Sequence, residues 1–202
     1  MNSTSVRKNK MLDTNYFAKA KLGLDVAELE STCYELHDVI VESLTDGTGE
    51  NYDGERTMTT QLFDKYNLLM YPYPQIHGLY EGIRKTFRQR VPDGEYFIQC
   101  WLNIYRGDQS ISWHTHWDPK FEVYHGVYCV RGEGSITSYR KLPNGAPDTD
   151  VVNHNDHVCI SPSDGHEHRS HPWNGEGNRI TIAFDIVPAH NITWGFNHWI
   201  PV

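Results

Sequence analysis

The chain has 202 residues, which is the size of one ordinary domain. Hydrophobic residues make up 38% of it, aromatic residues 12% and charged residues 22%, and this composition excludes disorder over most of the length. The formal net charge of -8, from 18 Lys and Arg against 26 Asp and Glu, argues against a general nucleic-acid binder.

The sequence predicts a cytoplasmic protein with reduced thiols. No apolar run approaches the length needed to span a bilayer, and the first residues lack the apolar stretch of a signal peptide. The cysteines form no C-x-x-C pair that would indicate a zinc site or a redox motif, so we expect mostly buried thiols. They are Cys33, Cys100, Cys129 and Cys159.

The N-terminal part is typical of a tail followed by helices. Residues 1–12 are polar and mixed in charge, which predicts a mobile tail. Apolar residues recur at helical spacing after Asp25 and again after Pro74, so we expect two amphipathic helices in a helical part over about 13–92. Between them the glycine-rich and acidic stretch 45–57 predicts a surface loop, which is a candidate lid.

From about residue 93 the chain becomes a series of short strands. These are rich in Tyr, Val, Ile and Thr, and Asn144-Gly145 is a hairpin signal. Helices followed by many short antiparallel strands predict an α+β, mainly β domain over 13–202, with a sandwich or barrel core over about 93–190. The expected strands are 95–105, 122–131, 134–141, 150–160 and 179–187.

Eight of the twelve histidines lie within 114–171. In the segment SWHTHWDPK, His116 and Asp118 are two residues apart, and on an extended strand such residues point to the same face. The segment 164–172, DGHEHRSHP, offers a third ligand. Two imidazoles and one carboxylate on one face of a metal form the facial triad of non-haem Fe(II) oxygenases.

A second polar pair lies on the last long strand. Alternation along that strand puts Arg179 and Thr181 on one face, opposite a row of apolar residues. A guanidinium binds a carboxylate bidentately and a hydroxyl adds one donor, so the pair predicts a carboxylate clamp. The alternative is an arginine on a solvated strand face.

Four short motifs follow one another in the order and spacing of a known family. They are Tyr105-x-Gly107, His116-x-Asp118, His168 and Arg179-x-Thr181. This set resembles the Fe(II)- and 2-oxoglutarate-dependent dioxygenases, in particular their prolyl-4-hydroxylase-like branch, over about 95–188. His168 is the first choice for the distal histidine because of its spacing from the arginine, with His171 second and His166 third.

The resemblance implies a double-stranded β-helix, also called a jelly roll, with N-terminal helices packed on one sheet. It implies that Fe(II), 2-oxoglutarate and O2 serve to hydroxylate a C–H bond of a peptide residue such as proline, or of a small molecule, with formation of succinate and CO2. The implied metal ligands are His116, Asp118 and His168. The implied cosubstrate contacts are Arg179, which takes the far carboxylate, with Thr181, Tyr105 and Tyr128.

Several alternatives stay open at this point. His114 shares the face of His116, so a His-x-His pair is conceivable, although we assign His114 to the surroundings of the metal or to the substrate pocket. A cupin-like isomerase or sensor would use the histidines without 2-oxoglutarate, and a jelly-roll binding module would use no metal. The charge counts against nucleic-acid demethylation. The same ligand set binds several divalent metals.

Overall fold

The protein is described by a computed structural model that covers most of the chain. The predicted tail, the middle of the predicted loop 45–57 and the Asn144-Gly145 signal lie outside the described residues. The single domain expected over 13–202 stays a prediction. The described residues are 17–45, 56–107, 109–118, 120–141, 148–163, 166–192 and 198–202.

Both predicted amphipathic helices are confirmed. α1 (Val26–Leu44) begins after Asp25, whose Oδ1 accepts the backbone N–H groups of Ala27 and Glu28, each at 3.1 Å. α3 (Pro74–Arg90) has its proline at the first helical position, where a missing N–H costs nothing. A short helix, α2 (Met58–Gln61), lies between them, and 3-10 turns span Leu68–Met70 and Ala189–Asn191.

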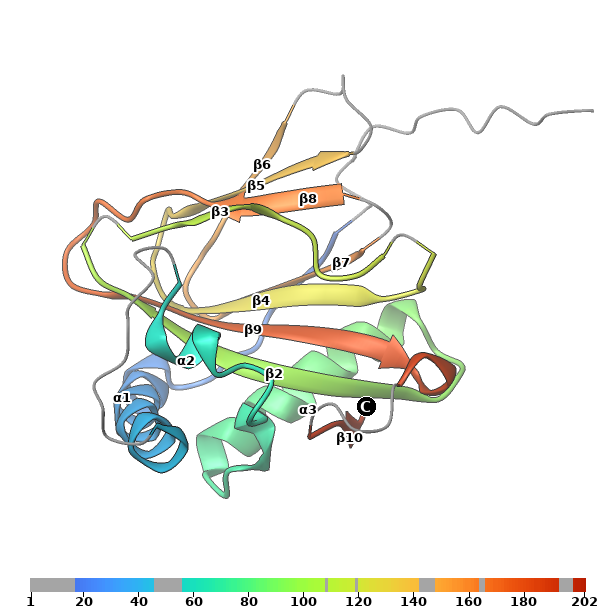
Figure 1. Ribbon diagram of the computed structural model, residues 1–202, viewed down its shortest axis with the longest axis horizontal. Helices are drawn as coiled ribbons and strands as arrows, with labels where there is room; N and C mark the ends of the chain where they lie inside the picture. Colours follow the sequence, from blue (N-terminus) through green and yellow to red (C-terminus); the bar gives the residue numbers. More distant parts are fainter. Residues whose placement is uncertain are drawn as a thin grey trace, which may run out of the picture.

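The strands form two antiparallel sheets that face each other (Figure 1). The larger sheet has the order β1-β7-β4-β9-β2-β10 and the smaller one the order β3-β8-β5-β6. This arrangement confirms the predicted mainly β jelly roll. The strands are β1 (Ala18–Lys21), β2 (Tyr96–Tyr105), β3 (Ile111–His114), β4 (Tyr124–Arg131), β5 (Ile136–Lys141), β6 (Thr149–Val152), β7 (His157–Pro162), β8 (His166–Ser170), β9 (Arg179–Pro188) and β10 (Ile200–Pro201).

The strand pattern differs from the prediction at several places. The strand β1 lies within the part that was expected to be helical, and neither β3 nor β10 is among the expected strands. The single strand expected over 150–160 is divided into β6 and β7, which belong to different sheets. The chain turns between them at Asp156, whose φ of 61° is left-handed. The strand β8 was not predicted, because its sequence HEHRS has no β-branched or apolar residue, and it is held by pairing with β3 and β5.

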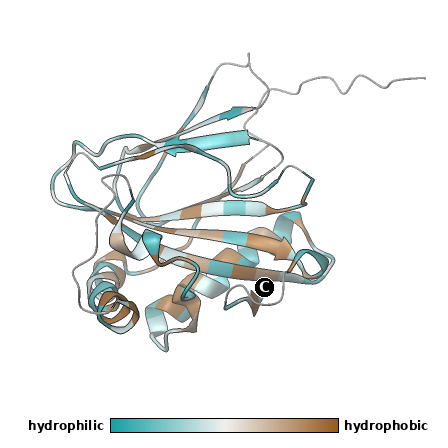
Figure 2. Cartoon of the chain, viewed as in Figure 1, coloured by the Kyte–Doolittle hydropathy of each residue, from teal (hydrophilic) through white to brown (hydrophobic). Residues whose placement is uncertain are grey.

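The main hydrophobic core lies between the helices and the larger sheet. Ile180, Ile182 and Phe184 of β9 belong to this core together with Leu29 and Ile83 of the helices. Apolar residues accordingly gather in the helices and the larger sheet, whereas the smaller sheet is mostly hydrophilic (Figure 2). The alternate residues of β9 face the smaller sheet, so a polar site lies between the two sheets.

All four cysteines are buried and unpaired, as expected. Burial raises the pKa of Cys33, Cys129 and Cys159 to about 12, so these thiols are unreactive at neutral pH. Among the described residues, no helix has both the length and the apolar character needed to cross a bilayer.

A close approach between strands makes Gly126 of β4 sensitive to substitution. A Cβ there would overlap the Phe184 ring and lie 2.8 Å from the carbonyl oxygen of Cys159. We expect Gly126→Ala to lower the free energy of unfolding by about 1 to 3 kcal/mol, because a packed ring and a sheet backbone must move. Urea denaturation measures this. Gly78→Ala in α3, which meets only one side-chain atom of Leu24 at 3.2 Å, is the control and should be close to neutral.

Candidate metal centre

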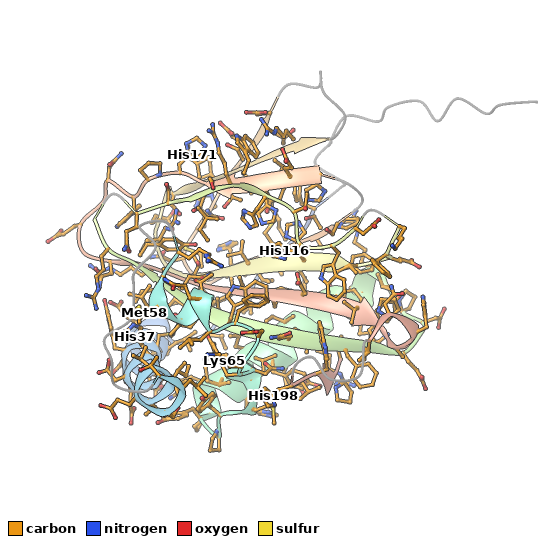
Figure 3. The ribbon with its side chains drawn as sticks, viewed as in Figure 1. His37, Met58, Lys65, His116, His171 and His198 are labelled. Atoms are coloured by element: carbon orange, nitrogen blue, oxygen red, sulfur yellow. The ribbon has the colours of Figure 1, made fainter. Side chains whose placement is uncertain are left out.

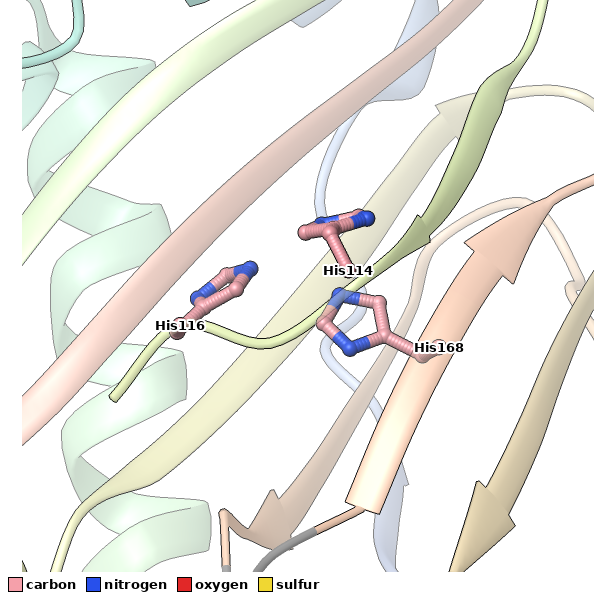
Figure 4. A group of neighbouring side chains, drawn as sticks. All are labelled: His114, His116 and His168. Atoms are coloured by element: carbon pink, nitrogen blue, oxygen red, sulfur yellow. The ribbon is translucent and has the colours of Figure 1, made fainter. Parts of the chain in front are cut away.

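Three imidazoles converge between the two sheets. His114 ends β3 and lies directly opposite His168 of β8 in the strand register, and His116 follows in the next loop. The ring centroids are 4.2 Å apart for His114 and His168, and 4.8 Å apart for His116 and His168. One nitrogen of each ring lies within 4.8 Å of the other two. Figure 4 shows the three rings pointing toward one another.

Two of these rings have a defined proton position. His116 Nδ1 lies 2.6 Å from Asp185 Oδ1, and His114 Nδ1 lies 2.8 Å from the carbonyl oxygen of Ser112. A carboxylate and a carbonyl only accept hydrogen bonds, so each neutral ring carries its proton on Nδ1. The Nε2 lone pairs of both rings are therefore available to a metal.

The third ring, that of His168, is half-buried and has one buried nitrogen without a partner. His168 Nδ1 has no hydrogen-bond partner among the described residues. Burial lowers the pKa of His168 well below its usual value, and it lowers the pKa of His114 to about 4. Neutral imidazoles are the form that binds metals. A group of imidazole rings with an unpaired buried nitrogen among them fits a divalent metal ion.

Asp185, a carboxylate that was not predicted as part of the site, is hydrogen-bonded to one histidine of this cluster. Asp185 of β9 accepts from His116 through Oδ1 and from Trp117 Nε1 through Oδ2, the latter at 3.0 Å. It is 7% exposed. The signal for it was present in the sequence, because Asp185 has the same alternation phase on the strand as Arg179 and Thr181.

The predicted carboxylate ligand lies elsewhere. The Asp118 side chain is 52% exposed, and its Oδ2 lies 3.1 Å from Lys120 Nζ. Hydrogen bonds from Lys120 lower the pKa of Asp118. The strand β3 ends at His114, so the extended geometry behind the prediction does not continue as far as Asp118. Of the predicted ligands, the structure brings together His116 and His168 and leaves Asp118 outside.

The alternative distal histidines have other neighbours. His171 Nε2 lies 2.6 Å from Ser138 Oγ, and Figure 3 places it at the smaller sheet while His116 lies between the sheets. His166 Nε2 lies 2.8 Å from His125 Nε2, and both residues are buried. Of the three candidates from this segment, His168 is the one next to His114 and His116.

Arg179, the arginine of the predicted carboxylate clamp, is buried at the start of β9. Arg179 is 1% exposed, its Cζ lies 3.9 Å from the centroid of the Tyr105 ring, and its Nη1 donates to the carbonyl oxygen of His171 at 3.1 Å. Its Nε and Nη2 have no partner among the described residues. A buried cation with free donors fits an anionic ligand.

Of the other predicted cosubstrate contacts, two lie beside Arg179 and one does not. Tyr105 is paired with Arg179 in the strand register, and burial raises the pKa of its hydroxyl. Thr181 is buried and accepts from Asn103 Nδ2 at 3.3 Å. Tyr128 belongs to the core under the helices, and its hydroxyl donates to Asp156 Oδ1 at 3.0 Å, so the structure leaves it outside the site.

No protein-family model and no curated protein matches the chain. Many solved structures are similar in fold, and three of them serve as examples. The prolyl hydroxylase of Trichoplax adhaerens, in complex with a peptide fragment of the hypoxia inducible factor oxygen degradation domain, has a TM-score of 0.63 at 13% identity, with 89% of this chain and 86% of that chain covered. AviO1 of Streptomyces viridochromogenes has a TM-score of 0.62 at 16% identity, with 88% and 91% covered.

The third is HygX of Streptomyces hygroscopicus with nickel and 2-oxoglutarate bound, which has a TM-score of 0.60 at 14% identity, with 88% of this chain and 84% of that chain covered. The chain is thus a jelly roll with a histidine cluster between its sheets. Its fold is the double-stranded β-helix of the 2-oxoglutarate oxygenases, including prolyl hydroxylases, as the resemblance implied.

Proposed function

We propose that this protein is an Fe(II)- and 2-oxoglutarate-dependent dioxygenase that hydroxylates a C–H bond of a peptide residue, such as proline, or of a small molecule. The observation that carries the proposal is the buried Arg179, whose Nε and Nη2 lack partners among the described residues. It lies on the same strand face as Asp185, which contacts the histidine cluster. A metal protein that takes no carboxylate ligand has no need of such a cation.

The proposal assigns a task to each group of the site. His116 and His168 hold the metal, and Arg179 takes the far carboxylate of 2-oxoglutarate with Tyr105 and Thr181 beside it. When bound, Fe(II) and 2-oxoglutarate activate O2, so that one oxygen atom enters the substrate as hydroxyl and the other enters succinate, with release of CO2. HygX, whose structures contain nickel with 2-oxoglutarate or iron, supports this choice of metal and cosubstrate.

Aromatic side chains next to the cluster would keep water from the reacting atoms. The Trp101 ring lies 5.6 Å from the His116 ring, and the Phe63 ring lies 5.7 Å from the Trp101 ring. Trp117 adds a further indole, held by Asp185. The peptide bound to the Trichoplax hydroxylase supports a peptide substrate class. The cytoplasmic location expected from the sequence stays a prediction.

Anaerobic titration of metal-stripped protein with Fe(II) and 2-oxoglutarate tests the proposal. We expect a visible metal-to-ligand charge-transfer band in the wild type, because the keto acid chelates the metal, and its loss in His168→Ala. His154→Ala is the matched control, since the His154 side chain is 53% exposed and pairs with Glu133. If iron binds but no band appears, the proposal fails and the cupin-like alternative without 2-oxoglutarate is favoured.

A further inference from the structure

We infer that the metal centre of this chain consists of three histidines, His114, His116 and His168, and that its carboxylate, Asp185, acts from outside the ligand sphere through His116. The inference rests on the proposed function for the identity of the metal. It differs from the two-histidine, one-carboxylate facial triad that the sequence motif predicts.

The backbone places two of the three ligands. His114 and His168 are direct partners in the antiparallel pairing of β3 with β8, so their side chains stand side by side on one face of the smaller sheet. His116 approaches from the loop that follows, with its ring 5.3 Å from that of His114 and 4.8 Å from that of His168. Three nitrogens within 4.8 Å of one another can occupy one face of a metal.

Asp118 has a different task in the same loop. Its Oδ1 accepts the backbone N–H of Lys120 at 3.0 Å, and its carbonyl oxygen accepts the N–H of Phe121 at 2.9 Å. An aspartate that bonds to the backbone two residues further on stabilises a turn. Asp118 therefore shapes the chain reversal after the site, with its side chain 52% exposed and paired with Lys120.

Asp185 supplies the negative charge that Asp118 does not bring. Both of its oxygens are in use, one by His116 Nδ1 at 2.6 Å and one by Trp117 Nε1 at 3.0 Å. Because the carboxylate accepts a hydrogen bond from Nδ1–H, the Nε2 lone pair of His116 is left for the metal. A carboxylate in this position orients its histidine and raises the basicity of the ligating nitrogen. Asp185 is thus a positioning residue, not a ligand.

Metal binding in the absence of 2-oxoglutarate tests this assignment. Co(II) is titrated into metal-stripped full-length protein, and Cu(II) EPR is recorded for the nitrogen hyperfine pattern. We expect three equatorial nitrogens in the wild type and one fewer in His114→Ala. We expect Asp185→Asn to raise the dissociation constant for Co(II) by roughly 10- to 100-fold, and His114→Ala to raise it further. Asp118→Asn is the control from the same loop and should leave both readouts unchanged.

Two results would overturn the assignment. The first is a Co(II) dissociation constant in Asp118→Asn that rises as much as in His114→Ala, and the second is an unchanged hyperfine pattern in folded His114→Ala. If His114→Ala does not fold, as judged by circular dichroism, the assignment is tested by the Co(II) dissociation constant of Asp118→Asn and by the number of equatorial nitrogens in the wild type.

The ligand set and the proposed function can fail separately. A wild type that binds Co(II) through three histidines but gives no charge-transfer band with Fe(II) and 2-oxoglutarate supports the ligand set and rejects the oxygenase. A wild type that binds no divalent metal rejects both.

Discussion

If the proposed function is right, we expect replacement of Arg179 by Met to weaken 2-oxoglutarate binding by about 2 to 4 kcal/mol, or roughly 30- to 800-fold, because a charge-assisted pair shielded from water is lost. The guanidinium is buried, and its Nε and Nη2 have no partner among the residues that the structure describes, so both can donate to a carboxylate. Met fills a similar volume and keeps an apolar contact with the ring of Tyr105, against which Arg179 is stacked. Titration of the charge-transfer band with 2-oxoglutarate gives the affinity.

The same variant separates a functional role of Arg179 from a structural one. A buried cation with unpartnered nitrogens contributes little to stability, so we expect Arg179→Met to be at least as stable as the wild type in urea. Arg106→Met, at an exposed arginine next to Tyr105, is the control and should keep the wild-type affinity. An Arg179→Met protein with unchanged 2-oxoglutarate affinity would show that the clamp lies elsewhere.

We expect replacement of Asp156 by Ala to lower the free energy of unfolding by about 3 to 5 kcal/mol, because three buried or part-buried donors lose their carboxylate acceptor. The carboxylate, which is 6% exposed, accepts from the N–H of Gly23 at 2.9 Å, from the N–H of Leu24 at 3.0 Å and from the hydroxyl of Tyr128 at 3.0 Å. It therefore ties the segment before α1 to β4. Urea denaturation measures the loss, and the melting temperature should fall by about 10 °C.

Two further variants control this result. Asp156→Asn keeps one acceptor oxygen and tolerates the left-handed φ of 61°, so it should lose less stability than Asp156→Ala. Tyr128→Phe removes one of the three hydrogen bonds and should cost about 1 kcal/mol, with 2-oxoglutarate affinity unchanged. A Tyr128→Phe protein of normal stability but weakened 2-oxoglutarate binding would contradict the structural role and favour the cosubstrate contact expected from the sequence.

The helices and the last long strand were predictable because their signals are local. An N-cap at Asp25 and a proline at position 74 mark helix starts that depend on a few neighbouring residues. The alternation on β9 separates Arg179 and Thr181 from Ile180 and the other core residues without reference to any partner strand. Such patterns also predicted the mainly β fold and the burial of the cysteines.

Long-range pairing decided the details of the site. The spacing of His116 and Asp118 predicts a shared face only while the chain stays extended, and β3 ends at His114 because its pairing with β8 ends there. The carboxylate that contacts the cluster, Asp185, comes from a strand far along the chain, and no local pattern links it to His116.

The amino-acid sequence by itself therefore determined the fold class, the histidine-rich character of the site and the face of β9 that carries Arg179. Only the tertiary structure decided which histidines meet, that Asp118 shapes a turn and that Tyr128 points to the helices. The physical reason is that residue spacing specifies direction within one element, whereas a site between two sheets depends on where each strand ends and on the register of its partner.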